Sequence, residues 1–150
     1  MDGIDRKILA ELQSDGRLTI TELAERIQLS LSPAHRRLRD LERSGVIAGY
    51  RALVDPGSVG LHFETIVFVT MREATRDAIA TFEAAIADVP HVVDAQRLFG
   101  DPDYIVRVVA RDLEHFQRIY DEELSALPGV QRFNTTLVMK NVVTSRALPI

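Results

Sequence analysis

The stretch "SPAHRRLRDLERSG", residues 32–45, places four arginines within eight residues of a chain whose formal net charge is −4. At 100° per residue, its apolar side chains share one face of a helix, and most of its arginines lie opposite, away from a core. His35 and Arg37 fall on the flanks between the two faces. The apolar face holds Ala34, Leu38 and Leu41, and the opposite face holds Ser32, Arg36, Arg39 and Arg43.

Two shorter helical patterns precede this stretch. Apolar residues recur at helical spacing from Ile4 to Leu12, and Asp2 can cap that first helix. The sequence from Thr19 to Glu22 has the form of a capping box and predicts a second, short helix that ends near Gln28. Ser30 or Ser32 caps the third helix, and Pro33 is tolerated in its first turn because no intrahelical donor is needed there.

Three short helices with a tight turn before the third form a helix-turn-helix, in which the third helix enters the DNA major groove. Arginine suits such a helix because its planar fork reaches guanine and its fixed charge neutralises phosphate. The alternative is a solvated helix face, with Asp40 and Glu42 as ion-pair partners. The short capped second helix and the Ser-Pro entry favour DNA binding, because a merely solvated face needs neither.

The periodicity changes after residue 60, where strands and helices alternate. Phe82, Val89 and Pro90 align with Tyr120, Leu127 and Pro128 at a constant offset of 38 residues. Two strand-helix-strand units in series predict a ferredoxin-like βαββαβ fold. We expect strands at 46–54, 61–71, 91–99, 103–110 and 130–143, and helices at 75–87 and 113–126.

The predicted fold class is therefore α+β, with a winged-type helix-turn-helix domain followed by a ferredoxin-like domain. The predicted boundaries are 1–50 for the helix-turn-helix domain, 51–60 for a strand and linker, 61–142 for the βαββαβ domain, and 143–150 for a tail.

Composition restricts the class of protein. The chain has no cysteine, so disulfides, thiolate metal sites and a cysteine nucleophile are excluded. Its four histidines show no ligand spacing, and no nucleophile or phosphate-loop motif is present, so we expect no metal, no cofactor and no enzyme activity. The apolar runs are too short to span a bilayer, and the first residues do not resemble a signal peptide, so we expect no membrane partner and a cytoplasmic protein.

The turn "FGDPDY", residues 99–104, lies between two predicted strands. Glycine, aspartate and proline are the residues that ordinary turns require, and spacing alone favours that interpretation. The alternative is a small-molecule site, because a carboxylate can hold an ammonium group and turn N–H groups can receive a carboxylate. Together those groups would bind the shared end of a free amino acid.

Residues 4–56, "IDRKILAELQSDGRLTITELAERIQLSLSPAHRRLRDLERSGVIAGYRALVDP", resemble the DNA-binding domain of the Lrp/AsnC family of transcriptional regulators. The segments "GDPDYIVRV" (100–108) and "LPGVQRFNTTLVMK" (127–140) resemble the effector-binding domain of the same family. The resemblance covers nearly the whole chain, and its motifs run in the family's order. "GDPDY" and the closing "TSRALPI" look most like the branch with regulators of branched-chain amino-acid metabolism.

The resemblance implies a DNA surface on the third helix. Two positions depart from the family's pattern: Gln28 stands where many relatives have glycine, and Arg36 stands where the residue is often acidic. If Gln28 takes a positive φ, the conformation costs about 1 kcal/mol. The implied groove residues are Ser32, Pro33, His35, Arg36 and Arg39, with Arg37 and Arg43 nearer the phosphates.

The resemblance also implies an amino-acid effector, or a related small molecule, bound at the hairpin where dimers meet. The family forms homodimers through the sheet, and the dimers commonly assemble to octamers. The implied effector residues are Gly100, Asp101, Asp103 and Tyr104, with Thr135 and Thr136 as neighbours and Arg97 and Leu98 as walls.

The sequence thus predicts a sequence-specific regulator of transcription that binds double-stranded DNA and whose assembly and DNA affinity respond to the effector. The competing interpretation is a small-molecule-binding or enzymatic α+β protein whose N-terminal helices serve only association.

Overall fold

A computed structural model describes residues 1–150 and divides the chain into two compact units. One unit comprises Met1–Leu53 together with Val142–Ile150, and the other comprises Val54–Asn141. Two segments of the chain therefore connect the units. None of the helices combines the length and the apolar character that crossing a membrane requires.

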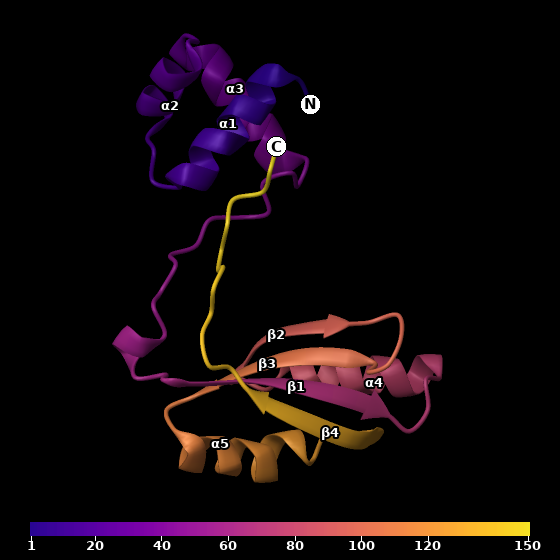
Figure 1. Cartoon of the computed structure of the whole chain (residues 1–150). Helices are drawn as coiled ribbons and strands as arrows, with labels where there is room; N and C mark the ends of the chain where they lie inside the picture. Colours follow the sequence, from indigo (N-terminus) through magenta and orange to yellow (C-terminus); the bar gives the residue numbers. More distant parts are fainter. The chain divides into compact units, whose positions relative to one another are not determined.

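The first unit contains three helices, as the sequence predicts: α1 (Gly3–Ser14), α2 (Ile20–Ile27) and α3 (Leu31–Arg43) (Figure 1). Both expected N-terminal caps are present as capping boxes, on Asp2 for α1 and on Thr19 for α2. One apolar core joins the three helices. Its buried members are Ile8, Leu23, Ala24, Ile27, Ala34 and Leu41.

Gln28 ends α2 in the left-handed conformation, with φ 59° and ψ 45°. Its main-chain N–H donates to Glu25 O at 3.1 Å, and the Leu29 N–H donates to Ala24 O at 3.0 Å. These bonds occupy carbonyls at the end of α2 and turn the chain toward α3. Gln28 thus takes the positive φ at the position where many relatives have glycine.

The strand predicted at residues 46–54 is wrong, because the structure has no strand there. A strand needs a neighbouring strand for its main-chain hydrogen bonds. No strand of the structure pairs with this segment. Val46, Leu53 and Val54 are at least half exposed, and Ile47 packs against the core of the first unit.

The C-terminal segment packs with the first unit through α1. The Gln13 side chain accepts a hydrogen bond from the Leu148 main-chain N–H at 2.6 Å and donates to Leu148 O at 3.3 Å. The amide of Gln13 thus pairs with the tail much as a neighbouring strand would.

The second unit has the predicted βαββαβ order, and the ferredoxin-like fold is confirmed. All strand pairs are antiparallel, in the order β2-β3-β1-β4, so β1 lies between β3 and β4 (Figure 1). Its elements are a short 3₁₀ turn (Gly57–Val59), β1 (Phe63–Met71), α4 (Arg76–Ala87), β2 (Val92–Arg97), β3 (Tyr104–Ala110), α5 (Leu113–Ile119), a π-helical turn (Tyr120–Leu124) and β4 (Val130–Leu137).

Two element predictions differ from the structure in their extent. β4 ends at Leu137, which pairs with Thr65, and not at residue 143. It ends there because its partner strand begins at Phe63 and offers few further main-chain groups. The single helix expected at 113–126 is α5 followed by the π-helical turn.

The sheet has one covered face and one open face. Val67, Val69, Val106 and Val108 on the covered face pack against Phe82 of α4 and the helix α5. The alternate residues of the central strands lie on the other face and are half-buried, except Val109, which is buried. Ile66, Phe68 and Ile105 are the half-buried apolar residues of the central strands on this open face.

Candidate DNA-binding helix and effector hairpin

Two arginines of α3 are free on its exposed face. Arg36 forms no hydrogen bond or ion pair within the chain, and its side chain is exposed. The Arg39 Nε donates to the His35 Nε2 at 3.4 Å, which leaves the two Nη groups of Arg39 without partners. Both guanidinium groups can therefore donate to an external acceptor.

Arg37 is engaged inside the unit. It forms ion pairs of 2.8 Å with both Asp2 and Asp5 at the start of α1. The hydrogen bond to Asp5, followed by that to Asp2, raises the pKa of Arg37. The Asp5 main-chain N–H is the main cause that lowers the pKa of Asp2, with Arg37 as a further cause. Arg37 thus fastens α3 to the first turn of α1.

The remaining members of the predicted DNA surface flank these arginines. Arg43 forms an ion pair with Asp40 on α3, and both side chains are largely exposed. Ser32 is exposed and Pro33 half-buried in the first turn of the helix, where Ser30 is the capping residue. A helix with exposed arginines along its face presents donors to base edges and phosphates.

Asp103 anchors the hairpin between β2 and β3. The Leu98 N–H donates to Asp103 O at 2.7 Å and closes the turn. The Asp103 carboxylate accepts from the Met71 N–H at 2.7 Å, and its own N–H donates to Val69 O at 2.9 Å. One carboxylate oxygen of Asp103 is therefore already used to fix the hairpin against the end of β1.

Tyr104 belongs to the core of the second unit. Its ring packs against Phe82 with centroids 4.6 Å apart, and its hydroxyl donates to Glu83 Oε1 at 3.0 Å. Burial, followed by the hydrogen bond to Glu83, raises the pKa of Tyr104 to about 12. With Arg97, these two residues line a cavity of about 450 Å³ between α4 and β2.

Gly100 and Asp101 form the free part of the hairpin. Gly100 has φ 148°, which favours glycine, and both residues are exposed. The Asp101 carboxylate makes no hydrogen bond or ion pair within the chain. It is therefore the acidic group of the hairpin that is available to an ammonium ion.

Thr135 and Thr136 lie on the opposite edge of the sheet from the hairpin. They are on β4, which β1 separates from β3. At ~4.8 Å per strand spacing, β4 is about 10 Å from β3 and about 14 Å from β2. A single chain therefore does not bring Thr135 and Thr136 together with Asp101.

Two residues near the hairpin were not predicted from the sequence. Phe99 is fully exposed beside Gly100, although its ring is large and apolar. The position of an apolar residue, Phe99, within a predicted turn could have indicated its exposure. Glu83 lies on α4, and no local pattern connects it with Tyr104, which is 21 residues away.

No group of three or more His, Cys, Asp or Glu side chains is placed to hold a metal ion. The rings of His91 and His115 do meet edge to face, with centroids 4.8 Å apart. His91 contacts Val109 O, and His115 accepts from the Arg111 N–H. Each of these two histidines therefore has a main-chain partner for one ring nitrogen.

Comparison with known proteins agrees with the geometry of both units. Residues 64–148 match a family model described as the Lrp/AsnC ligand binding domain. Residues 1–48 match a model described as winged helix-turn-helix DNA-binding.

Similar proteins align along nearly their whole length. Over 150 residues, the chain is 37% identical to the Bkd operon transcriptional regulator of Pseudomonas aeruginosa, covering all of this chain and 98% of the relative. It is 36% identical to the leucine-responsive regulatory protein of Salmonella typhimurium, covering 100% of this chain and 92% of the relative.

Among solved structures, a transcriptional regulator from Neisseria meningitidis in complex with L-Met superposes with a TM-score of 0.92 and 37% identity. The superposition covers 99% of this chain and 96% of that one. These matches favour the DNA-binding interpretation over one in which the N-terminal helices serve only association.

Proposed function

Because the chain belongs to the Lrp/AsnC family, and so is a DNA-binding regulator of transcription and not an enzyme, we propose that Arg36 and Arg39 of α3 read its operator. We propose further that an amino acid bound at the hairpin controls the assembly of the protein and its affinity for DNA. We place the protein in the cytoplasm, the compartment of DNA in the bacteria that hold its relatives.

The DNA proposal is supported by a difference among neighbouring arginines in whether they have partners within the chain. Arg37 is held by two carboxylates and Arg43 by one, whereas Arg36 and the Nη groups of Arg39 have no partner. A free guanidinium can donate two parallel hydrogen bonds to guanine O6 and N7. We therefore assign base reading to Arg36 and Arg39, flanking contacts to Ser32, Pro33, His35 and Arg43, and the placement of α3 to Arg37.

The effector proposal rests on the chemistry of the hairpin. The unpaired Asp101 carboxylate suits the ammonium of an amino acid, and exposed turn N–H groups near Gly100 suit its carboxylate. The Neisseria regulator was solved with L-Met, and several relatives are named as leucine-responsive. These names support an amino acid with an apolar side chain as the effector.

The open face of the sheet supports a homodimer. Ile66, Phe68 and Ile105 form an apolar centre on that face, and the Glu64–Arg107 ion pair borders it. Pairing two such faces around a two-fold axis would cover the apolar centre. Because Thr135 and Thr136 lie on the other edge of the sheet, we propose that they reach the hairpin site from a different copy. We propose that this copy belongs to another dimer, so that dimers assemble further, to the octamer.

The test of DNA recognition is fluorescence anisotropy with DNA from immediately upstream of the protein's own gene. We expect Arg36→Ala and Arg39→Ala each to weaken specific binding by roughly 10- to 100-fold, since one bidentate base contact contributes about 1–3 kcal/mol. Arg76→Ala removes the same charge from the exposed start of α4 and serves as the matched control, with unchanged affinity.

Salt and effector titrations complete this experiment. The logarithm of the affinity should fall with the logarithm of the salt concentration by about 0.9 for each phosphate contact. One of the twenty amino acids should then change the affinity of the wild-type protein. Equal binding by wild type, Arg36→Ala and Arg39→Ala would contradict the assignment of α3 as the reading helix.

A further inference from the structure

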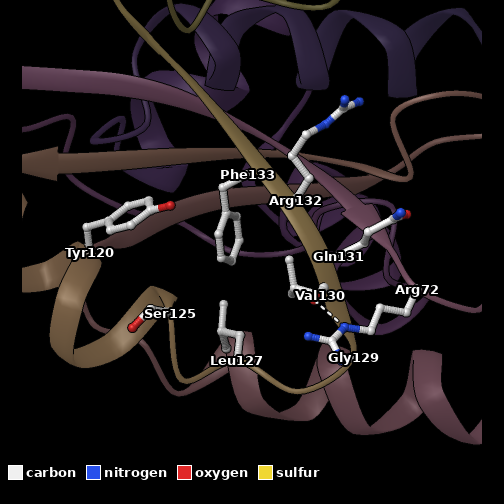
Figure 2. Close-up of a pocket in the computed structure, with 9 residues that line it drawn as sticks. All are labelled: Arg72, Tyr120, Ser125, Leu127, Gly129, Val130, Gln131, Arg132 and Phe133. Carbon is white, nitrogen blue, oxygen red and sulfur yellow. Dashed lines mark hydrogen bonds between the residues drawn. The ribbon is translucent and has the colours of Figure 1, made fainter.

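A second cavity, of about 580 Å³, lies beside the first residues of β4 (Figure 2). Its walls come from Arg72 after β1, from Tyr120 and Ser125 at the π-helical turn, and from Leu127 and residues 129–133. None of these residues belongs to the predicted effector set. The volume falls within the range that small-molecule sites occupy.

Arg72 is held in place at one side of this cavity. Its main-chain N–H donates to Gly129 O at 2.9 Å, and its Nε donates to Val130 O at 3.0 Å. The two Nη groups form no hydrogen bond or ion pair with the rest of the chain. The guanidinium is thus pre-positioned, with two parallel donors left for a ligand.

An apolar surface extends from Arg72 toward two hydroxyl groups. Leu127, Val130 and Phe133 lie between Arg72 and the pair Tyr120 and Ser125 (Figure 2). The Ser125 N–H donates to Tyr120 O at 2.8 Å, the bond that closes the π-helical turn. Such turns occur frequently at functional sites. The Tyr120 hydroxyl makes no hydrogen bond within the chain.

The cavity has a positive charge balance although the chain as a whole is acidic. Two of its nine lining residues are arginines, and none is aspartate or glutamate. Arg132 leaves β4 on the opposite side from Phe133, so Arg72 is the cation that faces the apolar surface (Figure 2). A ligand carboxylate would find a partner here, and an ammonium group would find none.

We propose that this cavity is a second ligand site, which binds an organic carboxylate that lacks an ammonium group. The carboxylate accepts two hydrogen bonds from the Arg72 Nη groups. The apolar body of the ligand covers Leu127, Val130 and Phe133, and its far end approaches the Tyr120 hydroxyl. The site differs in chemistry from the hairpin, where Asp101 offers a partner to an ammonium group.

Three matched probes test this selectivity by isothermal titration calorimetry on the full-length Asp101→Asn variant, in which the hairpin no longer offers a carboxylate to an ammonium group. 3-Phenylpropanoate has the proposed carboxylate and apolar body, L-phenylalanine adds an ammonium group, and 3-phenylpropanamide removes the charge. We expect 3-phenylpropanoate to bind at least tenfold more tightly than either of the others. Equal affinity for the propanoate and the propanamide would overturn the proposal, and so would the absence of propanoate binding at millimolar concentration.

Variants then locate the site. Arg72→Gln should weaken 3-phenylpropanoate binding at least tenfold, whereas the matched control Arg76→Gln should leave it unchanged. An unaltered circular dichroism spectrum of Arg72→Gln shows that the fold is intact. Tyr120→Phe keeps the ring and removes only the hydroxyl. Because the phenyl end of 3-phenylpropanoate carries no hydrogen-bond acceptor, this variant should bind the probe as tightly as the wild type does. Full binding by Arg72→Gln would overturn the assignment.

The proposal is separable from the DNA-binding function. Arg36→Ala lies in the other unit and should bind 3-phenylpropanoate as tightly as the wild type does. Arg72→Gln should in turn keep its affinity for operator DNA when no ligand is present. Loss of propanoate binding in Arg36→Ala would overturn the assignment of the ligand to the cavity beside β4.

Discussion

Thr65 is a polar residue in the covered face of the sheet, and its hydroxyl has no hydrogen-bond partner. The side chain is 1% exposed, between neighbours that are almost all apolar. Valine has nearly the same shape and needs no partner, so Thr65→Val should raise the free energy of unfolding by about 1 kcal/mol. Urea unfolding followed by circular dichroism measures the change. Thr144→Val, an exposed change of the same kind in the tail, should have no effect, and a less stable Thr65→Val would reveal a partner for the hydroxyl.

At the scale of elements, the start of α5 depends on a neutral histidine. The Asp112 side chain accepts a hydrogen bond from the main-chain N–H of His115 at 2.7 Å. The ring Nδ1 of His115 accepts one from the main-chain N–H of Arg111 at 3.2 Å. Protonation of Nδ1 would remove the second bond. Burial first, then the charges of Arg111, His91 and Arg118, lower the pKa of His115 below 6.5, against a smaller opposite effect of Asp112.

The lowered pKa of His115 makes the free energy of unfolding depend on pH. The unfolded chain binds the proton more readily than the folded chain does, so the stabilisation is complete above pH 6.5 and is lost as the pH falls through the lowered pKa. NMR titration of the imidazole protons should show a histidine with a midpoint below 6.5, and His115→Gln should remove that curve. Glutamine can accept from the Arg111 N–H without titrating, so this variant should also lose the pH dependence of stability. The control His62→Gln should retain the low-midpoint titration curve and the pH dependence of stability. If the curve that His115→Gln removes has its midpoint at or above pH 6.5, the assignment is contradicted.

The elements that sequence reasoning predicted well are those whose signals are local. The cap at Asp2, the capping box at Thr19 and the end of the second helix near Gln28 each depend on residues within one or two turns of helix. The strand expected at 46–54 and the full length of β4 depend on partner strands, which periodicity does not supply. The π-helical turn interrupts a helix whose apolar pattern continues through it.

The candidate site divides in the same way. The exposed face of α3 follows from helical spacing, and the structure leaves Arg36 and Arg39 on it. Arg37 pairs with Asp2 and Asp5, which lie more than 30 positions away in the sequence. Helical spacing therefore could not show that Arg37, unlike Arg36 and Arg39, is bound within the chain. Asp103 shares the hairpin with Asp101, but only the tertiary register shows that Asp103 contacts Met71.

At the scale of the whole molecule, the proposed effector site is complete only between copies of the chain. Asp101 is on the hairpin, and Thr136 is on the far edge of the same sheet, beyond β1. Asp101→Asn and Thr136→Val should each abolish the effect of the amino acid on DNA affinity in homogeneous oligomers. Asp77→Asn, a change of the same kind on α4, should preserve it.

Mixed oligomers distinguish a shared site from one built by a single chain. If each site takes its hairpin from one copy and Thr136 from another, random mixing of the two variants restores both groups in about one quarter of the sites. Co-expressed Asp101→Asn and Thr136→Val chains should then regain a partial amino-acid response, measured by anisotropy on operator DNA. A site within one chain would stay defective in every copy, because each copy carries one of the two changes. A mixture with no response would therefore contradict the shared site and with it the reason for assembly beyond the dimer.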